Sequence, residues 1–252
     1  MALIVGNFGW PAGRYCARAM VAGLLAIFAV ASSPVSPAQA QQRIGEAAHV
    51  RNNVVRVSVG RTRNLSAGGS VFRNETVRTG QDSSARLVFL DSTNLMLGPR
   101  SSVVLNRFVF AGRSSAQTLT INLARGAFRF TTGRLDKRAY KIRTPLATIG
   151  VRGPVLGIQS LLRLSRVTLA DDGAALVCAR FVRRCIELLR RGDSVEVTRG
   201  GIRRVRTGGR KFTFEPICSA NPGLCSPTQF ADAGPLTRPQ DPAGLGDALC
   251  GL

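Results

Sequence analysis

Few residues in this 252-residue chain can do chemistry, and the spacing of its cysteines favours disulfide bonds over metal binding. Six residues separate Cys178 from Cys185, and six separate Cys218 from Cys225. Zinc sites usually place cysteines about two to four residues apart, often with histidine. The single histidine, His49, is far from both pairs in the sequence. The cysteines therefore predict no metal site.

A hairpin would bring the first cysteine pair together. If the chain turns at Phe181-Val182, Cys178 and Cys185 face each other across two antiparallel strands, close enough for an S–S bond. This disulfide would contribute about 2.5 kcal/mol in the chain-entropy model. Cys218 and Cys225 bracket a turn-rich loop and form the second expected pair. Cys250 is left over: it is free, bonds another molecule, or competes in a different pairing.

Catalytic constellations are not evident in the sequence. A Ser/His/Asp triad would need His49, which lies in a weakly patterned segment before the first clear strand. A carboxylate pair for glycoside hydrolysis would come from residues at turns and strand edges, where acidic residues serve turn chemistry alone. These candidates are Asp82, Asp91, Asp136, Asp171, Asp172, Asp193 and Glu196. We predict no catalytic residue, cofactor or metal, and a secreted hydrolase is the least favoured function.

Residues 1–40 have the pattern of a secretory signal peptide. Arg14 and Arg18 precede the apolar run Ala19–Ala31, and Ala38-Gln39-Ala40 provides small residues for cleavage after Ala40. The run has 13 residues, fewer than the roughly 20 that cross a bilayer. We expect a periplasmic or secreted protein with no transmembrane span after cleavage. A retained membrane anchor is the alternative.

The chain is strongly basic, with a formal net charge of +21 that comes mostly from arginine. Such a charge favours an acidic partner. Export argues against nucleic acid and leaves a protein or an anionic envelope polymer. The best candidate surface is the densest basic cluster, formed by Arg199, Arg203, Arg204, Arg206 and Arg210. The alternative is that the arginines are scattered over solvated strand faces.

Alternating apolar and polar residues, interrupted by Gly, Pro, Asn and Asp, indicate an all-β chain. No segment after the signal has the length and period of a long amphipathic helix. We expect a twisted antiparallel β-sandwich or an irregular β-solenoid-like domain over residues 41–214, with the Cys-linked hairpin at 174–198. Residues 215–252 are rich in Pro, Gly and Ala and predict an irregular tail.

Several short motifs occur in an order and spacing that resemble the FecR domain, an extracytoplasmic all-β module. The first is G-x-x-S-x-A-x-L-x-F-x-D at Gly80–Asp91, where Ser92 replaces the usual Gly of the following turn. L-G-P-x-S follows at Leu97–Ser101. The later motif residues are Arg125, Gly126, Phe128, Thr144, Pro145, Ile149, Gly150, Val151, Arg152 and Gly153. Pro154 departs from the usual Thr. We expect these residues to have structural roles.

The resemblance implies a function only in outline. The regulator that gives the family its name also has a cytoplasmic anti-sigma segment and a transmembrane helix, and this sequence shows neither. The implied function is an exported, non-enzymatic binding, scaffold or signalling-accessory module of the bacterial cell envelope. A basic module that binds a polyanion or polysaccharide is the alternative. The oligomeric state is not predicted.

Overall fold

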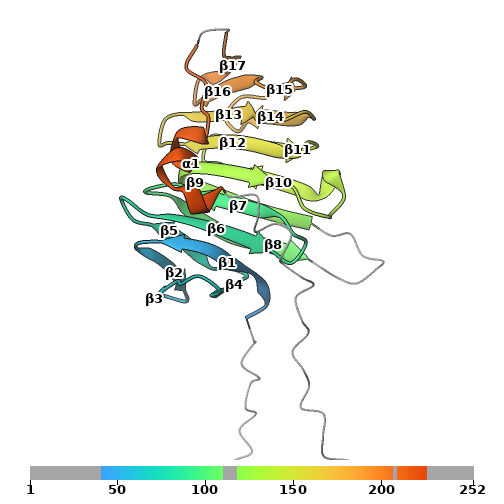
Figure 1. Cartoon of the computed structure of the whole chain (residues 1–252). Helices are drawn as coiled ribbons and strands as arrows, with labels where there is room; N and C mark the ends of the chain where they lie inside the picture. The colour runs from blue at the N-terminus through green and yellow to red at the C-terminus, as the bar shows by residue number, and fades with distance from the viewer. Residues whose placement is uncertain (1–40, 110–117, 207–208, 226–252) are drawn as a thin grey trace, which may run out of the picture. The chain divides into compact units, whose positions relative to one another are not determined.

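The computed structural model describes residues 41–109, 118–206 and 209–225 (Figure 1). Within these ranges, seventeen strands form two sheets whose inner faces enclose one hydrophobic core. The sheets share the long strand β9 (Thr118–Thr131). One six-residue α-helix is the only α-helix in the described ranges. The all-β prediction is confirmed.

The first sheet, sheet A, includes the second half of β9 and the two strands that pair with it. In spatial order its strands are β4 (Ser70–Phe72), β1 (Arg43–Arg51), β6 (Ser84–Phe89), β7 (Asn94–Leu97), β9, β12 (Val155–Ser160), β13 (Ser165–Leu169), β16 (Ser194–Thr198) and β17 (Gly201–Arg204).

The second sheet, sheet B, contains the first half of β9, and the one-turn 3-10 helix η1 (Lys137–Ala139) leads into its strand β10. In spatial order its strands are β3 (Arg61–Asn64), β2 (Val54–Ser58), β5 (Thr76–Thr79), β8 (Ser102–Val109), β9, β10 (Tyr140–Arg143), β11 (Ala147–Val151), β14 (Ala175–Ala179) and β15 (Cys185–Leu188).

After β9 the chain adds one hairpin at a time, alternately to the two sheets. The hairpins β10–β11 and β14–β15 extend sheet B, whereas β12–β13 and β16–β17 extend sheet A. Figure 1 shows the result as successive rungs. The two sheets are layered as in a β-sandwich, and successive hairpins follow one another along the sheets as in a β-solenoid. The pairings are antiparallel except at one place, where β10 runs parallel to β9.

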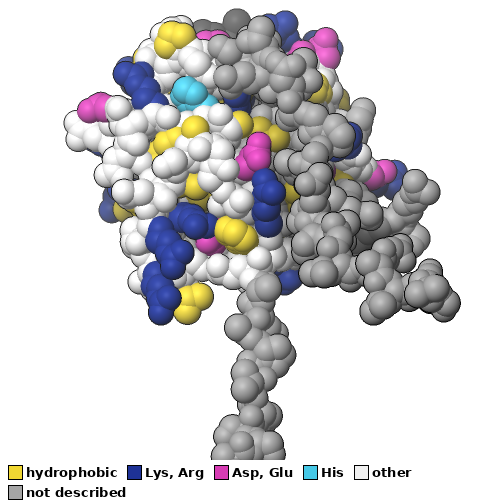
Figure 2. Space-filling model, turned by 60° about the horizontal axis from the view of Figure 1, so that its bottom comes forward, with side chains coloured by type: hydrophobic (Ala, Val, Ile, Leu, Met, Phe, Trp, Pro, Cys, Tyr) yellow, Lys and Arg dark blue, Asp and Glu magenta, His cyan; other side chains and the backbone are white. Residues whose placement is uncertain are grey.

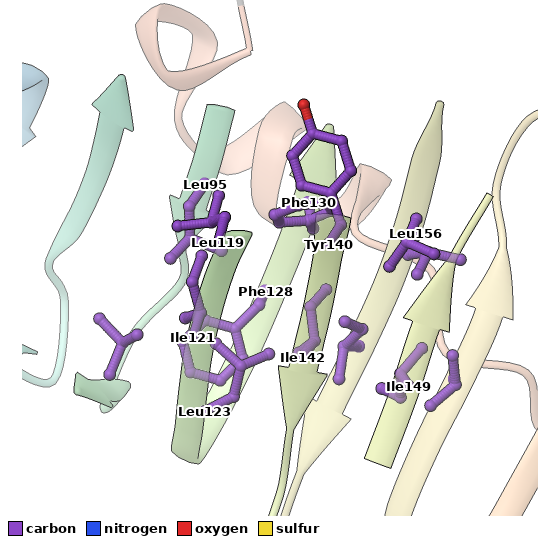
Figure 3. Packing of buried hydrophobic residues seen from close by; sticks show 14 of the residues in the cluster. Leu95, Leu119, Ile121, Leu123, Phe128, Phe130, Tyr140, Ile142, Ile149 and Leu156 are labelled. Carbon is purple, nitrogen blue, oxygen red and sulfur yellow. The ribbon is translucent and has the colours of Figure 1, made fainter. Parts of the chain in front are cut away.

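The core consists of apolar side chains from the inner faces of both sheets (Figure 3). The ring of Phe130 on sheet A meets Tyr140 on sheet B edge-on, with ring centroids 5.7 Å apart. The other labelled residues of the cluster in Figure 3 are Leu95, Leu119, Ile121, Leu123, Phe128, Ile142, Ile149 and Leu156. Alternation along each strand places these residues inside and polar residues outside.

The first strand begins earlier than the sequence pattern indicates. β1 pairs with β4 from Arg43 onward and with β6 from Gly45 onward, and it includes His49, which was expected to precede the first strand. Its register shifts between Ala47 and His49. A β-bulge changes which residues face the core, so the two-residue alternation is broken and the strand is hard to recognise.

The beginning of the predicted irregular tail is ordered by contact with sheet A. It forms α1 (Glu215–Ala220) and the 3-10 turn η2 (Pro222–Leu224), and an apolar cluster that includes Met96 and Phe214 lies beneath them. The Arg51 guanidinium donates hydrogen bonds to the Ala220 carbonyl and the Asn221 side chain. The described start of the predicted tail is therefore a short helix and turn packed against sheet A.

Several sequence predictions concern residues outside the described ranges. The signal peptide at 1–40, Cys250 and the tail from residue 226 onward all belong to this group. Across the described ranges, no helix combines the length and apolar character that a bilayer span requires.

Candidate binding surface

Arg125 and Gly126 mark the point where β9 passes from one sheet to the other. Arg125 pairs with Ser102 in sheet B, and Gly126 pairs with Ser160 in sheet A. Gly126 has a φ of 122°, and a Cβ atom there would overlap Ser101. A strand that changes sheets needs such a bend. This motif is therefore a structural joint, and the following Phe128 packs in the core.

Thr144 and Pro145 form the turn between β10 and β11. The buried Thr144 hydroxyl accepts hydrogen bonds from the Ala147 amide at 2.9 Å and from the Ser165 hydroxyl at 3.0 Å. The second bond links the turn in sheet B to the start of β13 in sheet A. A side-chain oxygen that bonds the main chain in this way stabilises a turn.

The Ile149–Gly153 motif occupies β11 and the turn after it. Ile149 and Val151 are buried in the core, whereas Gly150 has no atom within 4 Å of an added Cβ. At Gly153 an added Cβ would lie 2.9 Å from the Ala174 nitrogen, because two turns approach closely there. The Arg152 guanidinium is exposed and borders an open hollow with Arg134, Asp136 and Arg138.

Both predicted cysteine pairs are bonded in the structure. Cys178 lies opposite Cys185 in the β14–β15 register, as the hairpin argument requires, with their Cα atoms 4.0 Å apart. Cys218, within α1, is bonded to Cys225, which directly follows η2, with a Cα separation of 5.5 Å. The first bond closes a hairpin of sheet B, and the second closes the segment that covers sheet A.

The predicted basic surface, Arg199 to Arg210, does not form a single patch. Arg203 and Arg204 are neighbours on β17 and point to opposite faces, since strand residues alternate. Arg203 contacts Glu196 at 2.6 Å, and Arg204 contacts Asp193 at 3.6 Å. The Arg199 guanidinium lies 5.7 Å from the Phe181 ring centroid. Arg206 and Arg210 are exposed.

Glu196 shows how arginines on strands are neutralised. Its carboxylate accepts hydrogen bonds from Arg166 Nε at 2.7 Å and from Arg203 Nη2 at 2.6 Å. The bond from Arg166 is the main reason that the pKa of Glu196 lies below its ordinary value, with a further lowering from Arg203. Figure 2 shows a face on which basic side chains lie at several separate places rather than in one field.

Four turns at one end of the strands form a different basic surface, which we name the basic loop end. The turn 144–146 lies beside 180–184, because the Arg180 amide donates to the Leu146 carbonyl. The turn 161–164 lies beside the turn 199–200, because β13, which follows the first turn, pairs with β16, which precedes the second. None of the four turns contains an acidic residue. Their arginines are Arg163, Arg180, Arg183, Arg184 and Arg199, all exposed.

Large apolar side chains accompany these arginines. Leu162 is 82% exposed and Phe181 is 59% exposed. A groove runs between the turns of sheet A, lined by Leu162, Arg163, Thr198, Arg199 and Gly200. Guanidinium groups, a hydroxyl group and apolar carbon therefore occur together on this end of the molecule.

The other ends of the same strands carry the turns 152–154, 170–174 and 189–193, which we name the mixed-charge loop end. The turns lie side by side, since the Arg152 amide donates to the Ala174 carbonyl and the Gly192 amide donates to the Leu169 carbonyl. These turns contain both arginines and aspartates: Arg152, Arg190, Arg191, Asp171, Asp172 and Asp193. Asp193 accepts hydrogen bonds from the Leu189 and Arg190 amides, and the bond from Leu189 is the main cause of its lowered pKa.

Two of the residues considered above as catalytic candidates, Asp91 and His49, make contacts within the fold. The buried Asp91 carboxylate accepts hydrogen bonds from the Thr93 amide and from the Tyr140 hydroxyl, both at 3.0 Å. Burial is the main cause of the raised pKa of Tyr140. His49 packs against Gly223, and burial lowers its pKa, helped by Arg86. No group of three potential metal ligands occurs in the described ranges.

Sequence reasoning missed the basic loop end because its arginines are far apart along the chain. Only Arg199 belongs both to the predicted cluster and to this surface. One signal was available: the turns 161–164 and 180–184 contain none of the Gly, Pro, Asn or Asp residues that usually make turns. Leucine, phenylalanine and arginine at such positions indicate a use other than turn formation.

Comparison with known proteins identifies the central part of the chain. The FecR protein family matches residues 75–173, a range that includes all the FecR-like motifs from Gly80 to Gly153. No curated protein matches the sequence.

Two crystal structures of a candidate anti-sigma factor from Parabacteroides distasonis ATCC 8503, at 2.50 Å and 1.65 Å resolution, match the chain in part. Each is 16% identical to it, with TM-scores of 0.43 and 0.42. The matches cover 51% of this chain and 58% of the other, so the chain spans less than two thirds of that protein's length. Residues 75–173 of this chain are therefore similar to the FecR protein family.

Proposed function

We propose that this FecR-domain protein is an exported, non-enzymatic binding module of the bacterial cell envelope, with an acidic partner bound at the basic loop end. The observation that carries the proposal is the charge of this end. Five exposed arginines lie on three of its four turns, and none of the four turns contains a carboxylate. Arginine pairs readily with carboxylate and phosphate groups.

Export is supported by the two disulfides and by the pattern of residues 1–40. Disulfide bonds persist in oxidising compartments and are rare in the cytosol. The signal-like segment would direct the chain to such a compartment. The partner is then a component of the envelope, either an acidic protein or an anionic polymer.

A binding function without catalysis is supported by the surroundings of the polar groups. Asp91 is enclosed in a hydrogen-bond network, while Asp193 and Glu196 are paired with arginines. Such groups have stable partners in the fold. The arginines of the basic loop end, by contrast, face solvent and lack acidic neighbours on their own turns.

The proposal is tested with dextran sulfate as the anionic probe. Arg163→Ser, Arg183→Ser and Arg199→Ser are combined in one variant. We expect its affinity to fall about tenfold, because three exposed contacts of roughly 0.5 kcal/mol each add up to about that factor. Wild-type binding should also weaken steeply with added salt, which screens exposed charges.

A matched control removes the same number of charges from the mixed-charge loop end, by Arg152→Ser, Arg190→Ser and Arg191→Ser. The control should bind dextran sulfate within about twofold of the wild type. An equal loss in both variants would show that total charge, rather than the basic loop end, controls binding. Failure of the wild type to bind the probe would overturn the proposal.

A further inference from the structure

The two most exposed apolar side chains of the basic loop end come from different sheets. Leu162 lies on the β12–β13 turn of sheet A, and Phe181 lies on the β14–β15 turn of sheet B. Arg199 connects the two places: its guanidinium lies over the Phe181 ring, and it lines the groove beside Leu162. The apolar tips and the basic groove therefore form one continuous surface.

Turn formation does not explain these apolar residues. The disulfide between Cys178 and Cys185 already closes the hairpin that carries Phe181. At the mixed-charge loop end, the turn Asp171–Gly173 uses residues that favour turns through their own geometry. Exposed Leu and Phe at the basic loop end leave apolar area in water, and burying such a side chain is worth about 1.5–3 kcal/mol.

A soluble polyanion would satisfy the arginines and leave Leu162 and Phe181 in water. A bilayer that contains anionic phospholipid offers both kinds of contact. Its surface attracts each nearby Arg by about 1 kcal/mol, and its acyl region accepts apolar side chains. The groove between Arg163 and Arg199 includes the Thr198 hydroxyl, so it presents donors suited to a lipid phosphate.

Resting on the proposed function, we infer that the acidic partner is an anionic phospholipid bilayer, into which Leu162 and Phe181 insert while Arg163 and Arg199 bind headgroup phosphates. The turns of the basic loop end then contact the bilayer. The mixed-charge loop end, at the opposite ends of the same strands, faces away from the lipid. These turns then hold the domain at the membrane surface.

The test reads the environment of position 162 directly. Leu162→Trp is made in a Trp10→Phe chain, which leaves one tryptophan, and fluorescence is recorded with vesicles of phosphatidylglycerol and phosphatidylcholine. We expect a blue shift and protection from acrylamide quenching with mixed vesicles, and neither with phosphatidylcholine alone. Because the single tryptophan reports on position 162, insertion of the apolar run Ala19–Ala31 into vesicles would not by itself produce this signal.

The matched control is Leu189→Trp, because Leu189 is 58% exposed at the mixed-charge loop end. Its tryptophan should stay in water with every vesicle. Adding Arg163→Ser and Arg199→Ser to the Leu162→Trp chain should remove the blue shift. Identical spectra at positions 162 and 189, with or without vesicles, would overturn the inference.

Dextran sulfate binding separates the two proposals. A wild-type protein that binds dextran sulfate but gives no blue shift at position 162 retains the proposed function and loses the lipid assignment. A protein that does neither loses both. Leu162→Ser with Phe181→Ser should preserve dextran sulfate affinity within about twofold and reduce vesicle affinity about tenfold, equivalent to roughly 1.4 kcal/mol.

Discussion

The two loop ends are built on the same strands, yet their turns have opposite chemistry. At the mixed-charge loop end, Asp193 bonds two main-chain amides, and Gly153 packs against Gly173. At the basic loop end, two of the four turns, 161–164 and 180–184, carry Leu, Phe and Arg in place of turn-forming residues. The difference indicates that the mixed-charge loop end holds the hairpins together, and it supports the binding role proposed for the basic loop end.

The largest expected effect tests the close packing of the mixed-charge loop end. Gly153→Ala places a Cβ atom 2.9 Å from main-chain atoms of Gly173 and Ala174, which cannot move aside as a side chain can. We expect the free energy of unfolding to fall by about 3 kcal/mol, near the top of the usual range for overpacking. Urea denaturation measures this change.

Gly200→Ala is the matched control at the basic loop end, where the nearest atom to an added Cβ is Thr198 Oγ1 at 3.9 Å. Its free energy of unfolding should stay within about 0.5 kcal/mol of the wild type. Similar losses at Gly153 and Gly200 would contradict the assignment of stability to the mixed-charge loop end.

The next effect concerns the turn 180–184 of the basic loop end, which contains no Gly, Pro, Asn or Asp. Replacing Cys178 and Cys185 together by Ser should lower the free energy of unfolding by about 2.5 kcal/mol, since the loop is no longer closed in the unfolded chain. Thermal unfolding with and without reductant gives the comparison. If the double variant is as stable as the oxidised wild type, the turn is maintained by other contacts.

The smallest expected effect compares two kinds of arginine: those paired with a carboxylate on a strand, and those of the basic loop end. Glu196→Gln should reduce stability at pH 7 by about 2 kcal/mol, because two charge-assisted hydrogen bonds are weakened. The folded-state pKa of Glu196 is lowered from 4.5, so its contribution is complete above that value and is lost as pH falls through the lowered pKa.

The difference between wild type and Glu196→Gln should therefore vanish in acid, and denaturation at several pH values measures it. Arg163→Ser, which removes an exposed arginine with no acidic neighbour on its turn, should change stability by less than about 0.5 kcal/mol at any of these pH values. A difference between wild type and Glu196→Gln that persists unchanged in acid would contradict this role of the carboxylate.

The sequence predicted local features well where a single strand or turn decides them. The Cys178–Cys185 pairing follows from hairpin symmetry, and the structure has that register. β1 was missed because its bulge between Ala47 and His49 breaks the alternation. The helix α1 was missed because its six residues gain order from contact with Met96 and Arg51, which lie far away in the chain.

By itself, the sequence determined the all-β class, the cysteine pairs and the FecR motifs, because alternation, short loops and turn residues act within a few positions. Only the tertiary structure decided which arginines share a surface. Arg203 and Arg204 are adjacent in sequence and point to opposite faces of β17, each with its own carboxylate. Arg163 and Arg199 are far apart in sequence and line one groove, because hairpin pairing brings their turns together.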